Sequence, residues 1–234
     1  MYDSDVSTYD STGKVYQVLY AQEAPKQGSP IVAIAVGQTV VLAAATSSIS
    51  KLAIPQPKIF EIQQNIYVAV SGIYSDAKKD VQTARDLSDE YVLQYNTKLP
   101  ILNLVQDMAS QAQQRTQISS SRPHGAGLLF AGIEEEAFIF YTDPSAEYRK
   151  FKAYAIGRNA QAANAFLVKN YDVHATEEKL VEIAVRGLQK AFGEELKGIE
   201  VVVINQQGSF KKDGLTELRK VQEKFPEVED CDSD

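Results

Sequence analysis

Hydrophobic residues along this chain occur in short continuous runs and in longer runs with helical spacing. The first two short runs, 31–36 and 39–46, are almost wholly apolar or small, which is typical of strands covered on both faces. Between them, Gly37-Gln38 is compatible with a type II′ hairpin turn. The other short runs predict strands at 58–62, 65–71, 125–133, 137–142, 148–156, 200–205 and 209–212.

The longer runs place apolar residues three or four positions apart, which predicts amphipathic helices. Pro100 suits a first helical residue, and Thr176 can cap a helix whose early Glu177 and Glu178 suit its positive end. The predicted helices span 76–95, 100–116, 159–170, 176–192 and 215–225.

One more helix is predicted before the first strand. Ser11 or Thr12 can accept a hydrogen bond from the first free helical amides, so a start near Gly13 is expected. Pro25 lacks a backbone donor and costs about 3 kcal/mol inside a helix, so the helix should end or kink there. Gly28 suits the role of terminator.

Strands and helices come in blocks instead of strict alternation, which favours antiparallel sheets over a parallel sheet. Two sheets packed face to face, each covered outside by a helix pair, explain strands that are apolar on both faces. The predicted fold class is therefore α+β, a four-layer αββα sandwich with an extra N-terminal helix. We expect one domain over 1–225, with an arm and helix in 1–28, followed by an acidic tail at 226–234.

Composition indicates a globular protein with no nucleic-acid footprint. The 234 residues are 44% hydrophobic and carry a net charge of −7, whereas phosphate binding needs clustered Lys and Arg. The chain has one cysteine, Cys231, so no intrachain disulfide can form. Cys231 lies among the carboxylates of the tail, a setting that disfavours its thiolate. No signal peptide or membrane span is predicted, which favours a chain of the cytoplasm or nucleus.

Several short motifs follow one another in order along nearly the whole chain. They are Tyr2-Asp3-x-Asp5-Val6, Gly13, Gln17-Val18-x-Tyr20-Ala21-x-Glu23-Ala24, Gly28-Ser29, Gly72-Ile-Tyr-Ser-Asp76-Ala77, Arg122-Pro123-His124-Gly125-x-Gly127-Leu128-Leu129-x-Ala131-Gly132, Asp143-Pro144-Ser145 and Ile156-Gly157. Together these motifs resemble those of 20S proteasome alpha subunits, and the first of them is most similar to the alpha-six position of the eukaryotic ring.

The resemblance implies the αββα fold of N-terminal nucleophile hydrolases and a non-catalytic, structural and gating role in the heptameric outer ring. Tyr2 and Asp3 match the gate-forming pair, and Tyr20 matches the tyrosine that supports the turn beneath the arm. Lys58 and Gly28 match residues of the pocket that receives the C-terminal tails of regulatory particles.

The implied partners are the neighbouring alpha subunits, the beta subunits beneath them and those regulatory tails, with no nucleic acid or membrane. The implied process is ATP- and ubiquitin-dependent protein degradation in the cytoplasm and nucleus. Four residues depart from the family pattern, Ser4, Ser11, Leu19 and Pro25, and they bear on the geometry of the gate.

A catalytic alternative starts from Ser29, which follows Gly28 at the beginning of the first core strand. In catalytic members of this fold, such a residue becomes an N-terminal nucleophile, supported by an acid and a lysine. Lys58 lies near the position of that lysine, but no Asp or Glu occurs from Ala24 through Phe60. Pro30 also restricts the backbone that would rearrange during self-cleavage. A self-processed amidohydrolase is therefore the alternative, and a non-catalytic scaffold is the prediction; a homomeric binding scaffold is a third class.

The remaining candidate groups predict no cofactor and no metal site. His124 and His174 are the two histidines, and both are expected in loops with structural or solvent-facing roles. Glu134-Glu135-Glu136 is expected to form an exposed turn between two strands. Gly125-x-Gly127 begins a strand, the reverse of a dinucleotide fingerprint.

Overall fold

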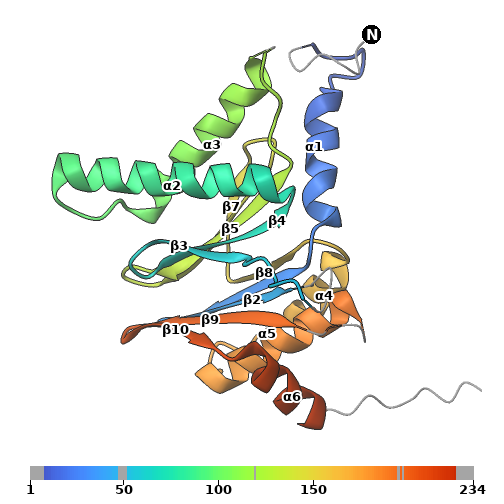
Figure 1. Cartoon of the computed structure of the whole chain (residues 1–234), viewed down its shortest axis with the longest axis vertical. Helices are drawn as coiled ribbons and strands as arrows, with labels where there is room; N and C mark the ends of the chain where they lie inside the picture. Colours follow the sequence, from blue (N-terminus) through green and yellow to red (C-terminus); the bar gives the residue numbers. More distant parts are fainter. Residues whose placement is uncertain (1–7, 47–51, 119, 194–195, 197, 225–234) are drawn as a thin grey trace, which may run out of the picture.

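The computed structural model describes residues 8–46, 52–118, 120–193, 196 and 198–224 (Figure 1). Within them, two five-stranded antiparallel sheets have the strand orders β10-β9-β2-β1-β8 and β3-β4-β5-β6-β7. The strands are β1 (Ile31–Val36), β2 (Thr39–Ala45), β3 (Ile59–Gln63), β4 (Ile66–Gly72), β5 (Ala126–Ile133), β6 (Ala137–Thr142), β7 (Tyr148–Phe151), β8 (Ala153–Ile156), β9 (Ile199–Asn205) and β10 (Gly208–Lys212). The helices are α1 (Tyr16–Gln27), α2 (Tyr74–Tyr95), α3 (Ile101–Gln117), α4 (Ala160–Asn170), α5 (Glu177–Phe192) and α6 (Gly214–Lys224).

Three hydrophobic clusters hold the layers together, and β1 contributes to two of them. Val32 and Ile34 point toward α4 and α5, whereas Ile31 and Ala33 point toward the other sheet. A third cluster joins the second sheet to α2 and α3 through Val68, Leu104 and other buried residues. This alternation confirms the predicted αββα sandwich, in which the sheets pack on each other and each carries a helix pair (Figure 1).

The hairpin between β1 and β2 turns at Gly37, whose φ is +57°. A positive φ at the first central residue is what a type II′ turn requires, so glycine is the favoured residue there.

The last helix, α6, packs on α5 and on β9, and its buried Leu218 and Val221 belong to the cluster that joins α4 and α5 to their sheet (Figure 1). Its end is tied down by Lys224, whose Nζ lies 2.6 Å from the carboxylate of Glu182 on α5. Lys179 reaches the same carboxylate at 2.6 Å. Burial of Glu182 favours its neutral form, but the two ammonium groups outweigh that effect and lower the pKa of its carboxyl.

The predicted strand over 148–156 is wrong in one respect, because it is two strands in two different sheets. β7 pairs with β6 in one sheet and β8 pairs with β1 in the other. The chain leaves the sheet of β7 at Lys152, whose carbonyl accepts a hydrogen bond from Ala35 N at 2.8 Å. A continuous run of β-forming residues does not reveal such a change of partner, since both halves have the same local preference.

The predicted start of the N-terminal helix is also wrong. The helix begins at Tyr16, its cap residue Val15 makes no side-chain hydrogen bond, and neither Ser11 nor Thr12 caps it. It continues through Pro25 to Gln27, and Gly28 ends it as predicted. Pro25 lies close enough to the helix end that its missing N–H disturbs only the last turn. In the helix pair of α2 and α3, Pro100 is the cap residue of α3 and not its first helical residue.

Candidate functional site

The residues predicted to bind a tail lie at one end of the sandwich, which we call the α1 end. Here β1 begins at Ile31, β3 begins at Ile59 and β4 ends at Gly72, and α1 packs across β4 and β5. Gly28 lies in the connection between α1 and β1, and Lys58 directly precedes β3. Tyr2 and Asp3, the predicted gate pair, lie outside the described residues.

Helix α1 is seated on the sheet through its last turn. Pro25 is buried, and its carbonyl accepts a hydrogen bond from Ser71 Oγ at 3.0 Å. Gly72 has a φ of +111°, and a Cβ built on it lies 2.3 Å from the carbonyl oxygen of Gly125. A Cβ on Gly127 lies 3.1 Å from Pro25 Cβ. Glycine is therefore needed at position 72, where backbones approach too closely for a side chain, and Gly127 leaves room for the Pro25 ring.

The connection from α1 to β1 is held from both sides. The carbonyl of Gly28 accepts a hydrogen bond from Arg158 N at 2.8 Å, and that of Ser29 accepts one from Ser71 Oγ at 3.1 Å. A Cβ on Gly28 lies 2.3 Å from both Gly72 N and Ser71 Oγ. Packing within this chain therefore already requires glycine at position 28, besides the predicted role of Gly28 in lining a pocket.

Lys58 presents a half-buried ammonium group at the α1 end. Its Nζ lies 5.2 Å from the centre of the Tyr74 ring, within the range of a cation–π contact. Burial lowers the pKa of this ammonium group. No carboxylate of the described residues lies within 4.0 Å of Lys58 Nζ, so an incoming carboxylate would find an uncompensated charge there.

Glu200 of β9 contacts this segment through its backbone and not through the Lys58 ammonium group. Its Oε2 accepts from the backbone N–H groups of Lys58 and Ile59 at 2.9 and 3.2 Å. It therefore fixes the backbone where β3 begins and ties this strand to the other sheet. Sequence reasoning missed Glu200 because it lies 142 positions from Lys58 along the chain.

Tyr20 lies on α1, with 52% of its surface exposed and its ring stacked on Tyr16 at 6.0 Å between centroids. The turn before α1 is organised by Asp10, a residue that sequence reasoning missed. The carboxylate of Asp10 accepts from the backbone N–H groups of Thr12 and Lys14, both at 2.8 Å. The hydrogen bond from Lys14 is the largest cause that lowers the pKa of the Asp10 carboxyl. The gate role of Tyr20 stays a prediction.

Other candidate groups have structural contacts. Glu134 to Glu136 are exposed as predicted, and Glu134 Oε1 accepts from Ile101 N at 2.7 Å, at the start of α3. His124 Nδ1 lies 2.8 Å from Asp80 Oδ1 of α2. Among the described residues, no group of three or more His, Cys, Asp or Glu side chains could hold a metal ion. Within the same ranges, no helix has the length and apolar character needed to cross a membrane.

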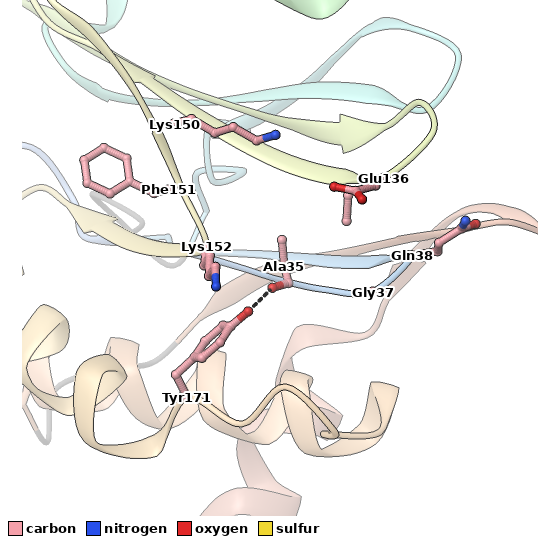
Figure 2. A pocket seen from close by; sticks show the side chains of 9 residues that line it. Ala35, Gly37, Gln38, Glu136, Lys150, Phe151, Lys152 and Tyr171 are labelled. Carbon is pink, nitrogen blue, oxygen red and sulfur yellow. Dashed lines mark hydrogen bonds between the residues drawn. The ribbon is translucent and has the colours of Figure 1, made fainter.

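A cavity of about 650 Å³ lies at the opposite end of β1 from Ser29 (Figure 2). Lys150, Lys152, Glu136 and Gln38 line it, and Tyr171 Oη donates to the carbonyl oxygen of Ala35 at 2.9 Å. Because β1 spans six residues, or about 20 Å at 3.3 Å per residue, this cavity is separate from the α1 end.

Comparison with known proteins supports the resemblance. A family model described as "Proteasome subunit" matches residues 25–204. The chain is 37% identical to the proteasome subunit alpha of Thermococcus sibiricus over 97% of this chain and 90% of that protein. It is 33% identical to the proteasome subunit alpha of Pyrococcus horikoshii over 98% of this chain and 90% of that protein. It is 34% identical to the proteasome subunit alpha type-1 of Dictyostelium discoideum over 81% of this chain and 77% of that protein.

These relatives are alpha subunits from archaea and from a eukaryote, so they support the alpha class and not one ring position. The fold agrees, with two antiparallel sheets between helix pairs and an N-terminal helix seated across one end. The chain therefore belongs to the proteasome family, as a member of its alpha class, the non-catalytic subunits of the outer ring.

Proposed function

We propose that this subunit helps to close and open the entrance of a proteasome core particle and that it docks regulatory particles at its α1 end. The observation that carries the proposal is the seat of α1. Pro25, Ser71 and Gly72 fix the last turn of the helix on the body of the protein, so α1 itself has a defined place there. An arm that precedes a helix fixed in this way could control entry by rearranging above a rigid base.

The gate residues of the proposal are Tyr2, Asp3 and Tyr20. Tyr2 and Asp3 offer a hydroxyl and a carboxylate that can bond to neighbouring arms. The exposed Tyr20 ring lies on α1, the helix that follows them in the sequence. The docking residues of the proposal are Lys58 and Gly28. The half-buried Lys58 ammonium would pair with the terminal carboxylate of a regulator tail.

Substitution of Lys58 by alanine should weaken the binding of a regulator tail to the assembled particle. A partly desolvated charge pair contributes on the order of 1–3 kcal/mol, so the dissociation constant of a tail peptide should rise about 5- to 150-fold. The measurement is a titration of particles with a regulator's C-terminal peptide. Lys98→Ala is the matched control, since Lys98 binds Gln64, which lies in the turn that joins β3 to β4. Equal affinity in the Lys58→Ala and Lys98→Ala particles would remove Lys58 from the docking site.

We further propose the alpha-six position of a eukaryotic ring, on the strength of Tyr2-Asp3-x-Asp5-Val6, and a location in the cytoplasm and nucleus. The partners would be two alpha neighbours and the beta subunits, in ubiquitin-dependent protein degradation. The end of α2 carries exposed hydrophobic side chains, since Leu93 is 86% and Tyr95 56% exposed. A contact with a neighbouring subunit would bury them, which supports the proposed assembly. Native mass spectrometry of the complex, which reports the neighbours directly, tests the position.

A further inference from the structure

A carboxylate on α2 reaches across to the loop that precedes β5. Asp76 is 3% exposed and forms a two-pronged ion pair with Arg122, with distances of 2.6 and 2.8 Å from Nη1 and Nη2 to its two oxygens. Its Oδ2 also accepts a hydrogen bond from Gly125 N at 3.1 Å. Burial opposes ionisation of Asp76, but these contacts outweigh burial and lower the pKa of its carboxyl. One buried side chain therefore fixes both ends of the segment 122–125.

This segment is part of the seat of α1, by which we mean the residues that contact the last turn of the helix: Ser71, Gly72, Gly125 and Gly127. The carbonyl of Gly125 accepts from Ile73 N at 2.8 Å, which joins the segment to the residue after β4. A Cβ built on Gly125 lies 2.9 Å from Ala24 Cβ of α1, so the backbone of Gly125 lies directly against the helix. Gly72, beside it, approaches both Gly125 and Pro25. The position of Gly125 therefore limits where the last turn of α1 can lie.

We propose that the Asp76–Arg122 ion pair positions helix α1, and through it the docking pocket, by holding Gly125 against the last turn of the helix. The part that concerns the pocket rests on the function proposed above. Both members of the pair lie outside α1, on α2 and in the segment before β5, so the effect passes through the backbone of Gly125. Asp76 and Arg122 are positioning residues for the docking step.

Substitution of Arg122 is the informative change, because its side chain is 61% exposed and its loss leaves no cavity. Without the guanidinium, Asp76 keeps the bond from Gly125 but loses the charge that balances its buried carboxylate. In assembled particles carrying Arg122→Ala, we expect backbone amides of residues 16–27 to exchange with deuterium about 5- to 10-fold faster, as local opening of α1 becomes easier. The half-maximal concentration of a regulator tail peptide for activating peptide hydrolysis should rise by a similar factor.

Two other variants make the result specific. Lys220→Ala removes a comparably exposed cation from an ion pair on α6 and should change neither quantity. Arg122→Lys keeps the charge but cannot form the two-pronged contact, so it should give an intermediate effect. It also replaces the alanine variant in the comparison if that variant does not assemble.

The outcomes separate this inference from the proposed function. Unchanged exchange over residues 16–27 in the Arg122 variants would overturn the inference, whatever the activation curve shows. Faster exchange with an unchanged activation curve, in particles where Lys58→Ala does weaken activation, would overturn the coupling to docking. If Lys58→Ala has no effect either, docking at Lys58 fails, and exchange in α1 still decides whether the ion pair positions the helix.

Discussion

Alanine at Gly72 is expected to lower the free energy of unfolding of this subunit by about 3 kcal/mol or more. Two costs add at this position. The φ of +111° is unfavourable for any residue with a side chain, and a new Cβ would lie 2.3 Å from a backbone oxygen, that of Gly125. A backbone atom cannot move aside as the end of a flexible side chain can. The seat of α1 must therefore open to accept the methyl group.

The measurement is thermal unfolding of the purified subunit. A loss of 3 kcal/mol corresponds to a fall in Tm of about 6–12 °C for a chain of this size. Gly193→Ala is the matched control, since Gly193 has a φ of +76° but no heavy atom of the described residues lies within 4 Å of a built Cβ. It carries the backbone cost alone. Equal falls in Tm for the two variants would show that the close approach of Gly125 is not what demands glycine at position 72.

Alanine at Gly28 is expected to destabilise the subunit by about 1–3 kcal/mol, through steric overlap alone. The φ of Gly28 is −67°, so its backbone conformation is open to any residue. The overlap arises because a built Cβ lies 2.3 Å from Gly72 N and from Ser71 Oγ. Relief of this overlap would displace Ser71, whose hydroxyl donates to Pro25 O and Ser29 O.

Chemical denaturation of the purified variants measures this effect. Gly187→Ala is the control, because Gly187 lies within α5 and a built Cβ is 3.4 Å or more from its neighbours. There alanine should be neutral or should stabilise the subunit by up to about 1 kcal/mol, since it favours the helix. A Gly28→Ala subunit as stable as the wild type would mean that glycine is needed at position 28 only for a bound tail.

The layers of this fold could be predicted from the sequence because each strand and helix carries its own pattern. The run 31–36 has buried residues on both faces, and the helix of 177–192 has its cap at Thr176, with a hydrogen bond from Lys179 N. Local signals of this kind depend on neighbours within a few positions. They fail where a distant contact decides, as at Lys152, where the chain changes sheets.

The α1 end shows the same limit. Lys58 and Gly28 were found by resemblance, whereas Glu200 was not, and Asp76 belonged to a matching motif without its bond to Gly125 N being predicted. An isolated acidic residue in a sequence is compatible with a solvated surface position. Only the fold brings Glu200 to the start of β3 and Arg122 to Asp76, 46 positions away.

The central claim is that the chain works with its α1 segment attached, as a non-catalytic subunit, and peptide mapping of the assembled particle tests it most directly. Trypsin cleaves after Lys26 and Lys51, so an uncut subunit yields one peptide from Gln27 to Lys51 that spans the Gly28–Ser29 bond. We predict this continuous peptide, unmodified after treatment with a covalent probe for N-terminal nucleophiles. A peptide that begins at Ser29 and carries the probe would contradict the account.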